Sequence, residues 1–289
     1  MMQYITGICT DAGVSRKGNQ DAVLVCQAET RFGSVCMAVV CDGMGGLRRG
    51  ELAGSTVVTE MAGWFEHSLP DILYHHFSVS EIKISLRQLV SGVNRRIQVY
   101  GERQGIKLGT TMTALLLVGD TYYICNIGDS RIYYLEDGIK LLTRDQSYVQ
   151  RQVDLGRMTA NEALHSSDRN ILLQCIGGEG EAFPDFYVGE YREKSGFLLC
   201  SDGFWHELYE EELRTGLRPE DFRAREDIED RLLSMIGMVK DRGETDNITG
   251  AYVCVKAKQR EGGKDTDGRQ EDYFHISEIR RVMPVDDTI

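Results

Sequence analysis

The chain has 289 residues, 42% hydrophobic and 27% charged, which is typical of a soluble globular protein and enough for one large domain or two small ones. Its formal net charge of −12 argues against non-specific nucleic-acid binding, and it repels a phosphorylated ligand unless local cations reverse the field. No stretch approaches the roughly 20 apolar residues of a membrane helix, we expect no signal peptide, and eight cysteines without zinc-type spacing indicate reduced thiols and a cytoplasmic protein.

The first half of the chain predicts three strands followed by two helices. Residues 1–41 contain the three strands, and 46–68 form the first helix, with apolar side chains on one face. The second helix begins at Ser78, because Ser78 and Glu81 match a capping box. Both helices are expected to pack against a sheet.

The second half returns to strands. Residues 111–118 and 121–126 flank Gly119-Asp120, a two-residue hairpin sequence. Residues 145–180 are polar with short helical stretches and indicate an insertion or flap. Two further strands, 197–200 and 248–255, enclose a third amphipathic helix. Because strands outnumber helices and come in consecutive hairpins, the sequence favours an antiparallel α+β layered fold over a doubly wound sheet.

The C-terminal residues 258–289 are interpreted as a polar tail outside the core. Residues 258–272 are too polar to order themselves and are expected to form a flexible linker. The apolar side chains of 273–279 predict a short docking segment that packs on this domain or on a partner. An inert disordered end is the alternative.

Four aspartates stand at the ends of apolar runs that read as buried strands: Asp42, Asp129, Asp202 and Asp246. Carboxylates held at such points repel one another unless cations lie between them, and hard divalent cations prefer oxygen ligands. Turn chemistry is the alternative for each, since Asp-Gly is a common turn dipeptide. Asp137-Gly138, between two short apolar runs, needs only a hairpin turn.

Seven short motifs occur in one order along residues 3–256. They are 16–21 (RKGNQD), 42–46 with 50–53 (DGMGG, GELA), 109–111 (GTT), 128–131 (GDSR), 143–147 (TRDQS), 201–203 (SDG) and 246–249 (DNIT). In this order the motifs resemble the metal-dependent Ser/Thr protein phosphatases of type 2C, in their compact bacterial form.

The resemblance implies a four-layer αββα sandwich of two antiparallel sheets, with a catalytic domain over 1–257 and a flap over about 145–180. It also implies a role for each site residue. Asp42 bridges two metal ions, the Gly43 carbonyl binds one of them, and Asp202 and Asp246 bind the other. Asp21 acts mainly through metal-bound waters, Asp129 with Asp202 helps to hold a weaker third ion, and Arg16 binds the substrate phosphate.

The implied reaction is hydrolysis of phosphoserine and phosphothreonine by in-line attack of a water or hydroxide that bridges two Mn2+ or Mg2+ ions, without a covalent phosphoenzyme. Two ions about 3.5–4 Å apart lower the pKa of a bridging water and neutralise developing charge. All-oxygen ligation argues against zinc, and the planar fork of an arginine suits a phosphate. The implied partners are phosphorylated proteins, namely a bacterial Ser/Thr kinase and its substrates, with no nucleic acid and no membrane.

Some of these residues also have an explanation that requires no role in metal or substrate binding. Arg16 is a surface residue by default, and Asp129 alone fits a turn residue with peripheral metal contact. Asp145 is expected to order the flap and not to bind metal. The three cations Lys17, Arg48 and Arg49 fit either attraction of a phosphosubstrate or solvated surface charge.

One departure from the family pattern concerns the leaving group. Many eukaryotic members carry a histidine after the Asp-Gly pair, where this chain has Met44. Of the six histidines, His165 and His206 lie in segments expected near the cleft. Two other functions are alternatives. A pseudophosphatase that binds phosphoproteins predicts a missing metal aspartate, and a regulatory phosphatase dedicated to one partner usually carries extra sensor domains or membrane segments.

Overall fold

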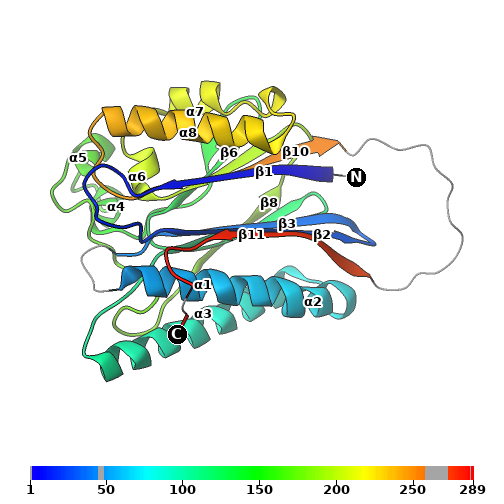
Figure 1. Cartoon of the computed structure of the whole chain (residues 1–289), viewed down its shortest axis with the longest axis horizontal. Helices are drawn as coiled ribbons and strands as arrows, with labels where there is room; N and C mark the ends of the chain where they lie inside the picture. Colours follow the sequence, from blue (N-terminus) through cyan, green and yellow to red (C-terminus); the bar gives the residue numbers. More distant parts are fainter. Residues whose placement is uncertain (1, 45–48, 258–272, 287) are drawn as a thin grey trace, which may run out of the picture.

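Two antiparallel sheets face each other with helices on their outer sides, in the computed structural model that describes residues 2–44, 49–257, 273–286 and 288–289 (Figure 1). The five-stranded sheet has the order β1 (Met2–Asp11), β10 (Ile248–Ala257), β9 (Gly196–Cys200), β6 (Arg131–Leu135) and β7 (Ile139–Leu141). The six-stranded sheet has the order β11 (Phe274–Val282), β2 (Ala22–Thr30), β3 (Gly33–Cys41), β4 (Met112–Val118), β5 (Thr121–Ile127) and β8 (Asp185–Glu190). The predicted αββα sandwich is confirmed.

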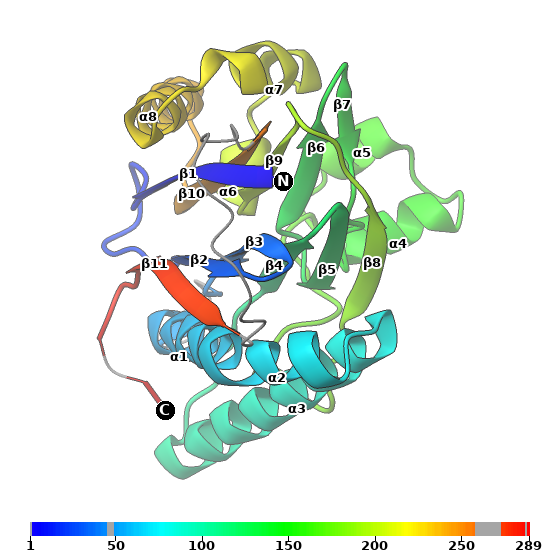
Figure 2. The ribbon, with the colours of Figure 1, turned by 90° about the vertical axis from the view of Figure 1, so that its right-hand side faces the viewer.

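The helices form the two outer layers, and Figure 2 shows each group against its sheet. The six-stranded sheet is covered by α1 (Gly50–Gly63), the π-helical turn η1 (Trp64–Ser68), α2 (Leu69–His75) and α3 (Val79–Gln104). The five-stranded sheet is covered by α6 (Asp202–Trp205), α7 (Glu210–Gly216), the 3-10 turn η2 (Pro219–Asp221) and α8 (Arg225–Asp241). The short helices α4 (Tyr148–Asp154) and α5 (Ala160–Leu164) lie beside the sandwich, in the predicted flap. None of the described helices has the length and apolarity needed to cross a membrane.

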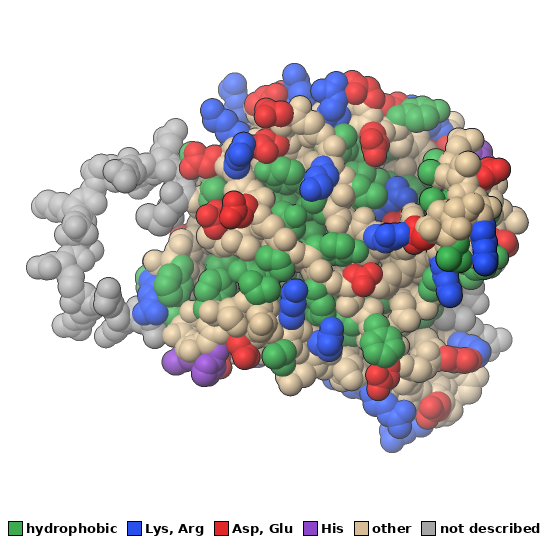
Figure 3. Space-filling model, turned by 180° about the vertical axis from the view of Figure 1, so that it is seen from behind, with side chains coloured by type: hydrophobic (Ala, Val, Ile, Leu, Met, Phe, Trp, Pro, Cys, Tyr) green, Lys and Arg blue, Asp and Glu red, His purple; other side chains and the backbone are tan. Residues whose placement is uncertain are grey.

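Strand alternation divides the interior into three apolar layers. On β3, Met37 and Val39 join the cluster under α1 and α3, whereas Ala38 and Val40 face the other sheet. Successive side chains of a strand point to opposite faces, so a strand that is buried on both faces is apolar throughout. The third cluster fills the space between α8 and the outer face of β9 and β10. Seen from behind, acidic and basic side chains are intermixed with apolar ones over the surface (Figure 3).

Local signals in the sequence were reliable. Residues 2–41 form three strands, the Gly119-Asp120 hairpin joins β4 to β5, and the Ser78 side chain accepts a hydrogen bond from the Glu81 backbone at the start of α3. The first helix, α1, begins at Gly50, and the predicted start at Gly46 lies, like Arg48, outside the described residues.

The interpretation of 258–289 as a tail outside the core was wrong for its second half. Residues 274–282 form β11, which pairs with β2 from Phe274 opposite Thr30 to Val282 opposite Val23. Phe274 also packs edge-on against Phe65, with 5.4 Å between ring centroids. The predicted docking segment therefore packs on this domain, because β2 offers an unpaired edge and an adjacent apolar layer. The expected linker 258–272 lies outside the described residues.

Candidate metal centre

The predicted acidic residues all lie at one end of the sandwich. Asp21 directly precedes β2 and Asp42 directly follows β3, which are antiparallel neighbours, so both occupy the same end of the six-stranded sheet. Asp129 lies in the turn between β5 and β6. Asp202 follows β9, and Asp246 comes shortly before β10, its antiparallel neighbour in the five-stranded sheet. Because the two sheets pack face to face, these five carboxylates lie at the same end of the sandwich.

The protein environment opposes ionisation of Asp21, Asp42 and Asp129. Burial raises the pKa of Asp21 to about 7, and the charges of Asp202 and Asp246 add to this rise. Burial likewise raises the pKa of Asp42 well above its usual value, with further contributions from Asp21 and Asp202. The pKa of Asp129 is raised well above its usual value, first by burial and then by Asp202. Like charges in a poorly solvated site destabilise one another, and a cation relieves that cost.

A hydroxyl connects the two sheets at this end. Ser201 donates a hydrogen bond of 2.9 Å to Asp21 Oδ2, and its Oγ accepts one of 3.0 Å from the Thr249 backbone. Ser201 is fully buried. The serine therefore orients Asp21 and is held away from solvent.

The backbone of Asp42 is fixed by the two threonines of the 109–111 motif. Its N–H donates to Thr111 Oγ1 at 2.9 Å, and its carbonyl accepts from the Thr111 N–H and from Thr110 Oγ1, also at 2.9 Å. A side chain at Gly43 would approach the Gln20 carbonyl to 2.5 Å, so only glycine fits. The sequence offered these residues only as motif members, since their function lies in long-range backbone contacts.

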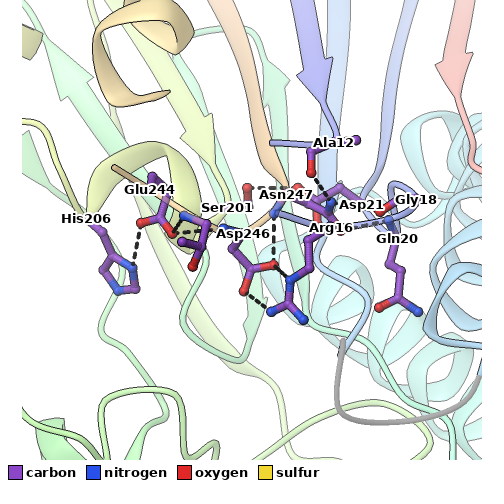
Figure 4. Close-up of polar contacts among 11 residues, drawn as sticks. Ala12, Arg16, Gly18, Gln20, Asp21, Ser201, His206, Glu244, Asp246 and Asn247 are labelled. Carbon is purple, nitrogen blue, oxygen red and sulfur yellow. Dashed lines mark hydrogen bonds and ion pairs between the residues drawn. The ribbon is translucent and has the colours of Figure 1, made fainter. Parts of the chain in front are cut away.

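Arg16 lies at the rim of the same site and binds one of its acids. Its Nε donates to Asp246 Oδ1 at 3.0 Å and its Nη2 to Oδ2 at 2.7 Å (Figure 4). The neighbouring Asn247 holds the loop that carries Arg16, because its Nδ2 donates to the carbonyls of Ala12 and Gly18, at 2.9 and 3.1 Å. The arginine is therefore presented at the site by a fixed loop.

The donor set fits divalent cations. Asp21 Oδ1 and Asp202 Oδ1 are buried and have no hydrogen-bond partner in the described protein, which is the condition of an oxygen that binds an ion or water. All the candidate ligand atoms are oxygens, as Mg2+ and Mn2+ prefer. Within the described residues, no three His, Cys, Asp or Glu side chains are arranged so that they could hold an ion as they stand. Asp246 in particular is engaged by Arg16, so ion binding requires side chains of the site to move, among them that of Asp246 or Arg16.

A cavity of about 260 Å³ lies between the flap and Asp129. Arg131 forms its polar wall, where Nε and Nη2 donate to the two oxygens of Asp145 at 3.0 and 2.8 Å, and its guanidinium lies 3.3 Å from the Trp205 ring centroid. Asp145 thus joins the start of the flap to β6. A larger cavity of about 1080 Å³ lies between α3 and residues 177–181 and contains none of the predicted site residues.

The two histidines expected near the cleft differ. His206 lines the flap cavity, and its Nδ1 lies 3.7 Å from Glu244 Oε2, whereas His165 is exposed and its Nδ1 lies 2.9 Å from the Asn161 carbonyl. Burial opposes ionisation of Glu244, but the nearby His206 and hydrogen bonds from the backbone N–H groups of Thr245 and Asp246 outweigh it and lower the pKa to about 2. Glu244 Oε1 accepts from the Asp246 N–H at 2.9 Å, so this pair supports the loop before Asp246. Sequence reasoning missed Glu244.

The chain is similar to known proteins over most of its length. The family model of Protein phosphatase 2C matches residues 14–246. A protein phosphatase 2C-type relative from Streptococcus pyogenes is 31% identical over 247 residues, 84% of this chain and 94% of the relative.

Two solved structures share the fold. The serine/threonine phosphatase of S. agalactiae has a TM-score of 0.74 and 31% identity, covering 89% of this chain and 100% of that chain. The catalytic domain of the serine threonine protein phosphatase PstP, in complex with two manganese ions, has a TM-score of 0.68 and 25% identity, covering 89% of this chain and 100% of that chain. Because the family match spans most of the chain and the fold agrees, the chain belongs to the protein phosphatase 2C family and is a protein phosphatase.

Proposed function

We propose that this phosphatase hydrolyses phosphoserine and phosphothreonine in proteins and that it depends on two bound Mn2+ or Mg2+ ions. The observation that carries the proposal is the convergence of Asp21, Asp42, Asp129, Asp202 and Asp246 at one end of the sandwich, with pKa values raised for four of them. The names of the similar proteins support the substrate class, and the manganese complex of PstP supports the metal.

The proposed metal ligands come from both sheets. Asp42 and the Gly43 carbonyl lie after β3, and Asp21 lies just before β2 of the same sheet. Asp202 follows β9 and Asp246 precedes β10 of the facing sheet. Asp129, beside the flap cavity, is proposed to hold a third and weaker ion together with Asp202. When bound, the ions would supply an activated water and neutralise negative charge at the phosphate.

The protein's own groups bind and orient the substrate. Arg16 is proposed to bind the phosphate, because a planar guanidinium donates two parallel hydrogen bonds to such an anion. Ser201 is buried between Asp21 and the Thr249 backbone and is not offered to substrate. Met44 carries no proton to transfer. We therefore propose direct attack of water in line with the leaving oxygen, without a covalent phosphoenzyme.

The proposed partners are a bacterial Ser/Thr kinase and its phosphorylated substrates. We also propose a cytoplasmic setting, which the eight free thiols support. A pseudophosphatase would be expected to lack one of the metal aspartates, and all of them are present.

The test is hydrolysis of a panel of phosphoserine, phosphothreonine and phosphotyrosine peptides. We expect activity on the first two, loss with chelator, and recovery with Mn2+ or Mg2+. Asp42→Asn should lower kcat by several orders of magnitude, while Asp137→Asn, in the β6–β7 hairpin, should leave it unchanged. Full activity in excess chelator would contradict the two-ion proposal.

A further inference from the structure

Arg16 binds the carboxylate that the proposed metal centre needs. Both oxygens of Asp246 accept hydrogen bonds from its guanidinium, at 3.0 and 2.7 Å (Figure 4). We propose that Arg16 is an exchangeable counter-ion of Asp246. It holds this carboxylate in the metal-free protein, a divalent cation displaces it, and the freed guanidinium then becomes available to the substrate phosphate. This inference rests on the proposed function.

The two cations compete for the same atoms. A bidentate guanidinium uses both oxygens of the carboxylate along one edge, and a metal ion bound there would place a second positive charge beside it. Asp42 and Asp202 also interact electrostatically with the Arg16 guanidinium. Once cations neutralise these acids, the attraction that holds Arg16 over the site disappears, and an anion becomes its best partner.

The ion pair is placed where it can open. The side chains of Arg16 and Asp246 are 39% and 24% exposed, so water can solvate both groups when they part. A partly exposed ion pair contributes little to stability, in contrast to a buried pair, whose separation leaves an uncompensated charge. The exchange therefore carries no large energetic barrier from desolvation.

The backbone around the ion pair can stay in place during the exchange. Asn247 anchors the loop backbone on both sides of Arg16, through Ala12 and Gly18, and its Oδ1 accepts from the Gln20 N–H at 2.9 Å. The Asp246 carboxylate is held by its own anchor, since Oδ1 also accepts from the Asn247 N–H at 2.8 Å. The loop thus keeps Arg16 within reach of the metal centre before and after the exchange.

Two consequences follow. Arg16 lowers the affinity of the Asp246 site for metal, because the ion pair must break first. Arg16 also binds phosphate only after the metal is bound, so the metal acts before the substrate. A simple phosphate clamp would show neither effect.

Calorimetric titration of Mn2+ into the 289-residue chain, freed of metal by chelator, tests the first consequence. Arg16→Ala should raise the affinity of one of the Mn2+ sites roughly two- to fivefold, the range expected for loss of an exposed competing pair. Lys17→Ala removes the same charge from the next residue of the loop and should change the affinity less than twofold. Arg16→Gln is a second variant that keeps most of the side chain.

The side-chain Nε resonance of Arg16 tests the second consequence without reference to activity. It is assigned by its absence in Arg16→Ala. Diamagnetic Mg2+ should shift it as the ion pair breaks, and inorganic phosphate should shift it further only when Mg2+ is present. Both responses would support the exchange.

The failures are distinguishable. No Mn2+ binding by the unaltered protein would overturn the proposed function and this inference together. Mn2+ binding with equal affinities in the unaltered protein and Arg16→Ala would overturn the exchange alone. Equal increases in Mn2+ affinity for Arg16→Ala and Lys17→Ala would also overturn it, because loss of any positive charge from this loop would then account for the change.

Discussion

Ser201 at the end of β9 donates a hydrogen bond of 2.9 Å to Asp21 at the beginning of β2, and so connects the two sheets directly beneath the proposed metal centre. The same hydroxyl oxygen accepts the Thr249 N–H from β10. One buried side chain therefore links three strands from two sheets at this end.

Replacement of Ser201 by alanine should destabilise the protein. Asp21 Oδ1 already has no hydrogen-bond partner, and the substitution would leave Oδ2 without the serine as well. A buried acceptor without a partner costs about 1–3 kcal/mol. Urea denaturation measures the change, with Ser167→Ala, exposed on the flap, as the control. Equal midpoints for the two variants would contradict this role.

The metal-free protein should become more stable as the pH falls from about 8 to 5. The pKa of Asp21 is raised from 3.8 to about 7 in the folded state, first by burial. Between these values the folded state binds more protons than the unfolded state, so the free energy of unfolding decreases as pH rises. Asp21→Asn should reduce this dependence, because it removes one of the acids whose pKa is raised, whereas Asp137→Asn, in an exposed turn, should leave it unchanged. Thermal denaturation in chelator at several pH values gives the comparison.

The Arg131–Asp145 pair should contribute much more stability than the neighbouring Arg144–Asp154 pair. The side chains of Arg131 and Asp145 are 17% and 8% exposed, whereas Arg144 is 57% exposed. Removal of one partner from a buried pair costs about 3–5 kcal/mol, and loss of an exposed pair about 0–1 kcal/mol. Denaturation of Arg131→Ala and Arg144→Ala measures the difference. Proteolysis should also cut residues 145–180 faster in Arg131→Ala.

Asp129 should affect activity at high metal concentration more than the binding of the first two ions. If it holds a third and weaker ion, Asp129→Asn should lower kcat at saturating Mn2+, while two tight sites remain in a calorimetric titration. The buried position of Asp129 in a short turn makes a folding role the competing explanation. Loss of the folded circular dichroism spectrum in Asp129→Asn would favour that explanation.

Arg280 on β11 should matter more than its neighbour Arg281. Arg280 reaches the opposite half of the sandwich, where its Nη1 donates to Glu229 at 2.7 Å and its Nη2 to the Thr6 carbonyl at 3.2 Å. Arg281 makes one exposed contact of 3.4 Å with Thr59. Charge-assisted hydrogen bonds contribute about 1.5–3 kcal/mol, so Arg280→Ala should lower the denaturation midpoint clearly and Arg281→Ala only slightly. Similar denaturation midpoints for the two variants would contradict the stabilising role of Arg280.

Truncation after Lys258 removes β11 as a whole. It would expose the hydrogen-bonding edge of β2 and the ring of Phe65. We expect lower stability and concentration-dependent self-association, since an open strand edge pairs with other chains. Hydrolysis of a small aryl phosphate should persist at low temperature, because β11 contains none of the proposed site residues. Light scattering and an aryl phosphate assay provide the two measurements.

Features that depend on neighbouring residues were predictable from the sequence. The start of α3 at Ser78 and the hairpin at Gly119-Asp120 follow from capping and turn chemistry within a few residues. The apolar runs that end at Asp42 and Asp202 are strands for the same local reason, and they place both acids at strand ends. Family motifs then related these acids to one site.

The tertiary structure decided which groups meet. Arg16 and Asp246 are 230 positions apart, and Ser201 and Asp21 are 180 apart, so no local pattern could pair them. Long-range pairing also explains β11. Its short alternating sequence follows a polar segment and by itself resembles a tail, and it becomes a strand because it pairs with the edge of β2. The amino-acid sequence by itself determined where strands end and which side chains stand there, because backbone propensity and side-chain period act over a few residues. The choice of partner depended on how two sheets pack face to face, which is a property of the whole chain.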